Sequence, residues 1–195
     1  KYEISYNANG GSGAPAAQSK THGTNLTLSS TVPKKYYTVT FNANGGSVDV
    51  ANRQVACTFK GWATSSTATS AAYQPGGTFT ANANTTLYAV WQNASLGSYP
   101  MPVRSGYVFD GWYTAASGGS QVTNSTTISG NMTIYAHWTI ATYEVNYDAN
   151  GGTGAPASQT KTHGKNLTLS STVPTRENYF FCGWGTEEAP DSVQY

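Results

Sequence analysis

The chain consists of short stretches in which apolar and polar residues alternate. Near its start, Tyr2, Ile4 and Tyr6 alternate with polar residues. Further on, Leu26 and Leu28 flank a threonine in the same way. A period of two is typical of strands that bury one face. Helical periodicity over ten or more residues is absent, although a connection has room for a short helix. The pattern therefore predicts a mostly β fold with little or no helix.

Two kinds of segment recur along the chain. The first, which we call the opening half, runs from a tyrosine-containing strand through Asn-Gly-Gly to a Leu-Thr-Leu stretch. Residues 2–33 and 143–174 share 25 of 32 positions, and a diverged copy begins at Tyr37. The Asn-Gly-Gly segment tolerates positive φ, so we expect the chain to reverse there in a hairpin-like turn. Pro33 and Pro174 end their segments, because proline has no N–H to continue a ladder.

The second kind, the closing half, begins with Phe-x-Gly-Trp. Its tryptophans are Trp62, Trp112 and Trp184, and we expect them to anchor the cores. Two closing halves end in a strand of β-branched and aromatic residues, at 86–91 and 133–138. Only 11 residues follow Trp184, so the third closing half lacks this strand. We therefore expect the chain to be a fragment of a longer array.

The halves do not alternate simply along the chain. Their order is opening, opening, closing, closing, opening and incomplete closing. We expect residues 1–92 to form a first repeat region with two opening halves and one closing half. Residues 93–140 supply the closing half of a second repeat. Residues 141–195 form a third repeat that is incomplete at its C-terminal end.

Two pairings of the halves fit this order. In the first, residues 38–92 form one contiguous module nested between residues 2–33 and 96–138. In the second, residues 2–33 pair with 57–91, and residues 38–55 pair with 96–138. The number of residues between Trp62 and Tyr73 equals the number between Trp184 and Tyr195. Because Trp184 follows an opening half of the 2–33 type, this equality favours the second pairing. The pattern alone does not choose between them.

Composition narrows the classes of function. Charged residues make up 10% of the chain and the net charge is +1, so no basic excess is present to neutralise nucleic-acid phosphates. Aromatic residues make up 13%, which is enough to build a core. No run of 18 apolar residues suggests a membrane span in this segment, and its first residues do not resemble a signal peptide.

The histidines do not form a catalytic set with a nucleophile and an orienting group. His22 and His163 occupy the same repeat position, each before a glycine, which favours a role in a turn. His137 falls on the outer face of a terminal strand, where we expect a surface or interface residue. We therefore predict no enzyme activity, no catalytic residue and no cofactor.

Thiols and carboxylates give no clear metal site either. Cys57 and Cys182 stand at non-equivalent repeat positions, which leaves a disulfide and two free thiols as alternatives. No Cys-x-x-Cys or histidine cluster suggests zinc. The single acidic cluster favours a solvated loop over cation binding, and we predict no metal; it comprises Glu187, Glu188 and Asp191. Six Asn-x-Ser/Thr sequons leave glycosylation open.

The ordered motifs resemble the Listeria–Bacteroides repeat, also described as the internalin B-repeat. The matching segments are Tyr-Thr-Val-Thr-Phe-Asn-Ala-Asn-Gly-Gly at 37–46, the stretch 102–114 that contains Trp112, and Leu-Tyr-Ala-Val-Trp at 87–91. The resemblance implies tandem β-grasp-like modules. It further implies an extracellular, often cell-wall-attached bacterial protein, with the modules acting as stalks or as interaction segments of adhesin-like proteins.

Two functions follow from these observations. The first is a secreted structural and interaction module of a bacterial cell surface, which meets protein partners or self-associates through sheet edges. A neighbouring molecule would then supply the strand missing after Trp184. The second is a carbohydrate-binding module that stacks sugar rings on exposed aromatics such as Tyr88, Tyr113 and Tyr135.

Overall fold

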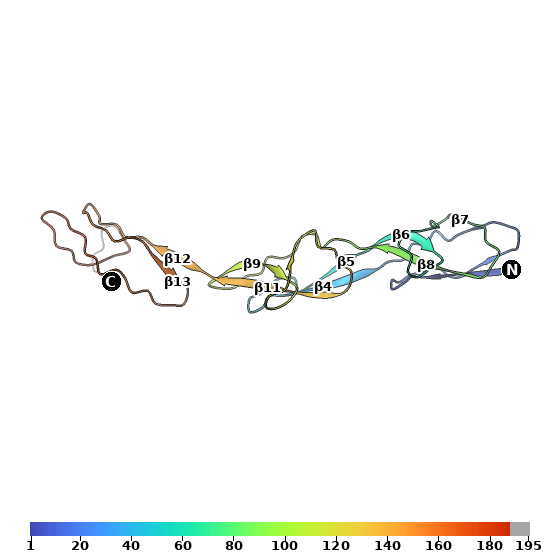
Figure 1. Cartoon of the computed structure of the whole chain (residues 1–195), viewed down its shortest axis with the longest axis horizontal. Coiled ribbons are helices and arrows are strands. Elements are labelled where there is room, and N and C mark those ends of the chain that lie inside the picture. The colour runs from blue at the N-terminus through green and yellow to red at the C-terminus, as the bar shows by residue number, and fades with distance from the viewer. Residues whose placement is uncertain (188–195) are drawn as a thin grey trace. The chain divides into compact units, whose positions relative to one another are not determined.

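The computed structural model describes residues 1–187, and regular structure in that range is entirely β (Figure 1). The prediction of a mostly β fold is confirmed, whereas the finer β-grasp-like expectation stays a prediction. Within these residues no helix qualifies as a membrane span. The strands are β1 (Tyr2–Asn7), β2 (Gln18–Lys20), β3 (Leu26–Thr27), β4 (Tyr36–Asn42), β5 (Asn52–Ala56), β6 (Thr58–Ala63), β7 (Thr78–Phe79), β8 (Thr85–Gln92), β9 (Tyr107–Tyr113), β10 (Gln121–Val122), β11 (Met132–Ile140), β12 (Thr142–Val145) and β13 (Gln159–Thr162).

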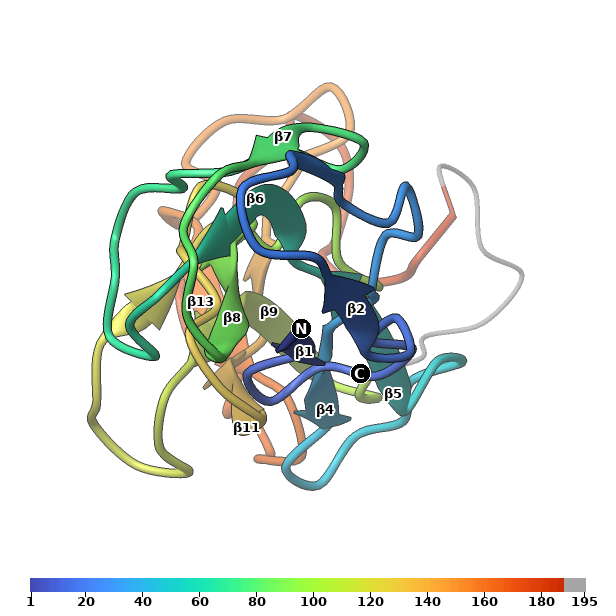
Figure 2. The same ribbon diagram turned by 90° about the vertical axis from the view of Figure 1, so that its right-hand side faces the viewer.

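The chain forms two compact units. The first unit comprises residues 1–103 and 110–137, and the second comprises residues 104–109 and the chain from Trp138 onward. The first unit contains two modules. We call residues 1–35 and 57–92 module 1, which faces the viewer in Figure 2. The remainder of the first unit, residues 36–56, 93–103 and 110–137, is module 2.

Parallel strand pairs decide how the halves combine. β1 pairs with β8 in parallel, with Ile4 opposite Thr85. β4 pairs with β11 in parallel, with Val39 opposite Met132. The first opening half therefore shares a sheet with the first closing half, and the second shares one with the second, which is the second of the two pairings. The division of the chain at residues 92 and 140 stays a prediction.

Module 1 is built on a four-stranded sheet in the order β2-β1-β8-β6. β8 is central, because β1 flanks it in parallel and β6 flanks it antiparallel with a bulge between Phe59 and Gly61. The small β3–β7 pair closes the module. Module 2 contributes to a five-stranded sheet in the order β10-β9-β11-β4-β5. The buried core of module 1 consists of Ile4, Leu28, Trp62, Phe79, Leu87 and Ala89.

Modules 1 and 2 are interlaced by the path of the backbone. The chain leaves module 1 after Lys35, forms the β4–β5 pair of module 2, and returns at Cys57 to begin β6. The Cys57 N–H donates to the Lys35 carbonyl at 2.9 Å, so the exit and the return lie side by side. After Gln92 the chain crosses into module 2 again. Three backbone connections therefore join the two modules.

The Asn-Gly-Gly segments form the predicted turns. Asn9 and Gly10 have φ of 49° and 82°, and the Gly11 N–H donates to the Ala8 carbonyl at 3.0 Å. Two consecutive positive φ values suit asparagine followed by glycine. The turn does not make a tight hairpin, however, because Ser12 bridges to a distant residue and the antiparallel partner of β1 is β2. The chain therefore reverses direction at this turn, and the strand that pairs with β1 begins only at Gln18.

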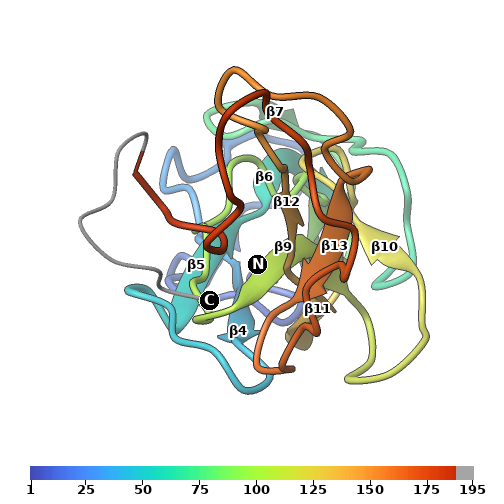
Figure 3. The same ribbon diagram turned by 90° about the vertical axis from the view of Figure 1, so that its left-hand side faces the viewer.

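The second unit contains the third repeat. We call residues 142–187 module 3, and its β12–β13 pair is visible in Figure 3. Thr153 bridges to Thr175 as Ser12 bridges to Lys34 in module 1. The opening half is therefore folded in module 3 much as it is in module 1.

Candidate interaction site

The aromatic cluster of module 3 repeats that of module 1. Tyr147 and Phe181 contact Trp184 with ring centroids 4.8 and 5.0 Å away. In module 1 the equivalent contacts to Trp62 measure 4.9 Å from Tyr6 and 5.0 Å from Phe59. The expectation that the tryptophan anchors its core is met for Trp62, which is fully buried, whereas Trp184 makes the same ring contacts but is only half-buried.

The two clusters differ in what covers them. In module 1, β8 places Leu87 and Ala89 fully buried beside Trp62. Within residues 142–187, no strand takes the place that β8 takes in module 1. A cleft of about 1310 Å³ lies there instead, lined by residues that include Tyr147 and Trp184.

Apolar surface is concentrated beside this cleft. Phe180 is 97% exposed and Phe181 is 39% exposed, although both are large apolar residues. Tyr179 and Val173 are also exposed. Contiguous exposed apolar residues mark interaction surfaces in soluble proteins. The lining of the cleft therefore includes exposed apolar side chains, Phe180 and Phe181 among them.

One wall of the cleft is held in place by a hydrogen-bonded trio. The Tyr147 hydroxyl donates to Gln159 Oε1, and the Ser170 N–H donates to both oxygen atoms at 3.0 Å. The same trio in module 1 consists of Tyr6, Gln18 and Ser29. The wall is therefore formed by the same bonds as in the filled module.

Both cysteines are free thiols. Cys182 is exposed, lies in the lining of the cleft, and has its Sγ 3.7 Å from the Phe180 carbonyl oxygen. Cys57 is half-buried at the crossing between modules 1 and 2. Burial raises the pKa of the Cys57 thiol, and the nearby Lys35 ammonium opposes that rise. The free-thiol alternative is therefore the one found.

The histidines lie in separate places. His22 is exposed beside Tyr2, with its Nδ1 2.9 Å from the tyrosine hydroxyl. His137 stacks on Tyr113 with centroids 3.9 Å apart, and its Nε2 is 2.9 Å from the Ala115 carbonyl. Across residues 1–187, no three histidine, cysteine or acidic residues gather closely enough to hold a metal ion. Of the predicted acidic cluster, Glu188 and Asp191 lie outside the described residues.

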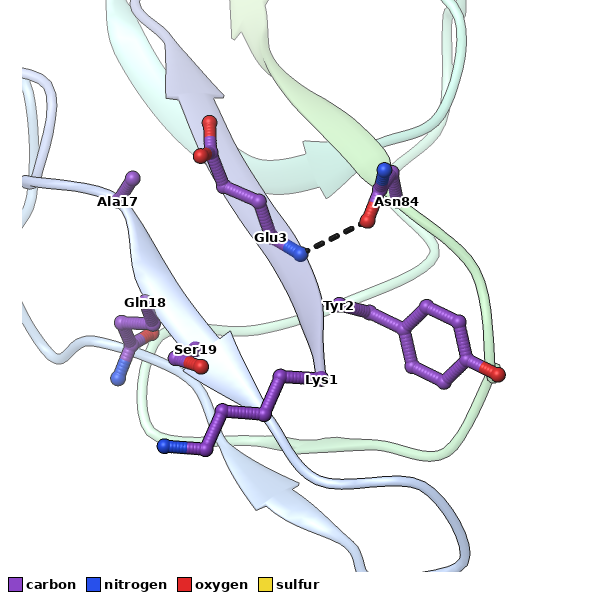
Figure 4. Close-up of a pocket in the computed structure, with 7 residues that line it drawn as sticks. All are labelled: Lys1, Tyr2, Glu3, Ala17, Gln18, Ser19 and Asn84. Carbon is purple, nitrogen blue, oxygen red and sulfur yellow. Dashed lines mark hydrogen bonds between the residues drawn. The ribbon is translucent and has the colours of Figure 1, made fainter.

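A smaller hollow of about 360 Å³ lies at the start of β1 (Figure 4). Its only marked bond joins the Glu3 N–H to Asn84 Oδ1 at 2.9 Å. The Lys1 amine and the Glu3 carboxylate point in different directions in this view. The hollow therefore brings no acid and base together.

The aromatics proposed for sugar stacking are less accessible than expected. Tyr88, Tyr113 and Tyr135 are half-buried, and His137 covers one face of Tyr113. The expectation that they stand exposed is wrong. Each lies on a strand within a sheet, Tyr88 on β8, Tyr113 on β9 and Tyr135 on β11.

The sequence analysis missed the role of the asparagine side chains in the turns. Asn9 Nδ2 donates to the carbonyls of Ser66 and Ala89, at 2.8 and 3.0 Å. Asn44 Nδ2 donates to Ala116 and Ala136 in the same way, at 2.9 and 3.0 Å. The sequence carried a signal for this role, because all three copies have an asparagine, with its side-chain amide, at this position.

Comparison with known proteins places these features in context. A family model described as the Listeria-Bacteroides repeat domain matches residues 2–36, 37–56, 53–90, 91–137 and 143–195. The chain is 36% identical over 84 residues to a protein of Evansella cellulosilytica named as a Gly-rich membrane protein. It is 29% identical over 108 residues to internalin H of Listeria monocytogenes. These matches cover 43% and 54% of this chain, and 10% and 19% of the relatives. No solved structure matches the chain.

Proposed function

Because the chain belongs to the Listeria–Bacteroides repeat family, we propose that it is an extracellular segment of a bacterial cell-surface protein. In this role it acts as a spacer and as a protein-interaction module. An internalin and proteins named as membrane proteins are among its relatives, which supports this placement. The near-neutral chain, with 10% charged residues, suits a hydrated outer surface. We also propose that the protein is attached to the cell wall.

The interlacing of modules 1 and 2 is the observation that carries the spacer role. Three backbone connections cross between them, at Lys35, Cys57 and Gln92. A module joined by one linker can swing, whereas three adjacent crossings restrict rotation. Tension on Lys1 and on the chain beyond Gln92 loads the parallel β1–β8 pair along its length, so its hydrogen bonds resist together.

Single-molecule stretching of the full chain from its two ends tests the spacer role. We expect modules 1 and 2 to unfold in one event, releasing roughly 3.5 Å of chain per unfolded residue. Two separate events for these modules would contradict the proposal. A variant carrying Leu87→Ala should lower the force of the event, because Leu87 is fully buried on the strand that bears the load.

We further propose that the cleft of module 3 accepts a β8-type strand from a partner molecule. The support is the match between its aromatic walls and those around β8 in module 1. Strand addition would pair the open backbone edge and bury the exposed phenylalanines. A second copy of the chain is the partner that the repeats suggest.

A synthetic peptide with the sequence of residues 85–92 tests the cleft. Added to the ¹⁵N-labelled full chain, it should shift the indole N–H signal of Trp184 and leave those of Trp62 and Trp112 unchanged. A peptide with aspartate in place of Leu87 and Ala89 is the matched control. Unchanged Trp184 with the first peptide, together with a strictly monomeric chain in light scattering, would overturn strand acceptance.

A further inference from the structure

Each Asn-Gly-Gly turn carries a dipeptide that is chemically labile. An asparagine before a glycine loses its side-chain amide readily, because glycine has no side chain to hinder attack by its own backbone nitrogen. The chain contains this dipeptide three times, at residues 9–10, 44–45 and 150–151, and each copy is the turn of an opening half. The turns are therefore the places where the chain is most able to modify itself.

The nitrogen that would attack lies at the surface. Gly10 and Gly45 are exposed, with φ of 82° and 91°. The hydrogen bond that closes the first turn comes from the next residue, since the Gly11 N–H donates to the Ala8 carbonyl at 3.0 Å. That bond leaves the Gly10 N–H out of its geometry. Access of water and base to the attacking nitrogen is therefore compatible with the folded turn.

The amide that would leave is held by the fold. Asn9 Nδ2 donates to the Ser66 carbonyl at 2.8 Å and to the Ala89 carbonyl at 3.0 Å. An amide group has two N–H bonds, so both are in use. The Asn44 amide makes the equivalent pair of bonds in module 2. The nitrogen must give up both bonds before it leaves, and the two acceptors lie on separate segments of the chain.

We propose that Asn9 and Asn44 are deamidation sites that the folded modules keep closed and that unfolding opens. The glycine nitrogen bonds to Cγ of the asparagine, and the amide nitrogen leaves as ammonia with the proton of the glycine N–H. A five-membered succinimide ring remains. Water then adds to either carbonyl of the ring and leaves aspartate or isoaspartate. Unfolding from any cause opens the site, so the reaction does not rest on the spacer role.

The product cannot restore the original contacts. A carboxylate is ionised at neutral pH and only accepts hydrogen bonds, whereas the Ser66 and Ala89 carbonyls are acceptors too. Two acceptors would then face a negative charge without a donor between them. Isoaspartate in addition lengthens the backbone within the turn. A module that has been open for long is therefore marked covalently and refolds with lower stability.

Comparison of folded and unfolded chain tests the protection. The full chain is kept at neutral pH with and without guanidinium chloride, and peptide mass spectrometry follows the conversion of each asparagine. We expect Asn9 and Asn44 to convert at least about ten-fold more slowly in the folded chain, because two hydrogen bonds must break first. A synthetic peptide of residues 5–13 in both solutions gives the effect of the denaturant on the chemistry itself. Equal rates in the folded chain and the peptide would overturn the proposal.

A core variant tests the link between opening and reaction without denaturant. Leu87→Ala removes a fully buried side chain from β8, the strand that carries the Ala89 carbonyl. It should raise the conversion rate of Asn9 several-fold. Val32→Ala is the matched control, because Val32 is 51% exposed in the same module, and it should leave the rate unchanged. An unchanged rate in Leu87→Ala would show that opening does not govern the reaction.

The converted chain tests the consequence. Chain deamidated at Asn44 in denaturant carries an extra negative charge, so ion exchange separates it from unconverted chain that has had the same treatment. After both are refolded, we expect the converted chain to have a lower urea midpoint for module 2. Equal midpoints would overturn the inference that deamidation leaves the module weakened.

Discussion

At the scale of single residues, the tryptophans carry much of the packing. Trp62 and Trp112 are both fully buried, and each contacts a neighbouring aromatic ring edge-on. Trp112 Nε1 donates to the Pro100 carbonyl at 3.1 Å, whereas Trp62 Nε1 is buried and has no hydrogen-bond partner among residues 1–187. A buried donor without a partner costs free energy. The two anchors are therefore alike in packing and unequal in hydrogen bonding.

Replacing Trp112 should unfold its module. Trp112→Ala removes a fully buried indole and leaves a cavity, which costs about 3–5 kcal/mol of unfolding free energy. Thermal unfolding followed by circular dichroism measures the effect. A transition at the same temperature as in the unaltered chain would contradict the placement of Trp112 in the core.

Because of Tyr6, the free energy of unfolding of module 1 should fall as the pH rises into the alkaline range. Burial raises the pKa of Tyr6 above its usual 10.0, and a hydrogen bond from the Ser29 backbone opposes the rise. The folded pKa thus exceeds the unfolded one. The stability this provides is present below the unfolded pKa and is lost as the pH rises through the folded value.

Tyr6→Phe separates this effect from general alkaline unfolding. The variant should lose about 1 kcal/mol at neutral pH, because Gln18 and Ser29 lose a partner. Its urea midpoint should fall less between about pH 8 and pH 11 than that of the unaltered chain. Phe41 stands at this position in module 2, so the ring alone is compatible with the fold. Equal pH dependence in both chains would count against the role of Tyr6.

At the scale of elements, the Asn-Gly-Gly turns tie each opening half to its closing half. The Asn44 amide reaches the carbonyl of Ala136 on β11 and that of Ala116 in the loop after β9. Asn9 does the same for β8 and the loop after β6. The turn therefore fixes the relative positions of segments far apart in the chain, in addition to reversing its direction.

Asn44→Gly should destabilise module 2 although glycine suits its φ of 47°. Two hydrogen bonds are lost, which costs about 1–3 kcal/mol in total. Asn44→Asp also loses the amide donors and should destabilise the module to a comparable extent. Chemical denaturation compares the three chains. A glycine variant as stable as the unaltered chain would mean that only the backbone conformation matters.

At the scale of the whole molecule, modules 1 and 2 share their chain path, whereas module 3 follows β11 in a single passage. β5 runs into β6 across Cys57 alone. Loss of β6 from its sheet therefore releases the C-terminal end of β5, the edge strand of the neighbouring sheet. Module 3 has no such exchange of strands within residues 142–187.

A core substitution in module 1 should consequently lower the stability of strands in module 2. Trp62→Ala is expected to increase hydrogen exchange at the amides of β4 and β5 as well as in β1 and β8. Tyr147→Ala in module 3 is the comparison and should leave exchange in β1 and β8 unaltered. Unchanged protection of β4 and β5 in Trp62→Ala would show that the modules unfold independently.

Much of the local structure could be predicted from residue patterns. Alternation at Tyr2, Ile4 and Tyr6 predicted β1, and asparagine before glycine predicted the turns. These features depend on neighbours a few residues apart. The hydrogen bonds of Asn9, over 57 and 80 residues, could not be read in this way. Nor could the close approach of the His163 ring to Gly106, where an added Cβ would come within 1.9 Å of the ring.

The sequence by itself determined that the protein is a repeated β structure with tryptophan anchors, because periodicity and turn chemistry are local properties. Only the tertiary structure decided that β1 joins β8 and that β4 joins β11. Each opening half presents nearly the same strand edge, so local pairing preferences do not distinguish the partners. The choice depends on burying Trp62 and Trp112 together with strands far away along the chain.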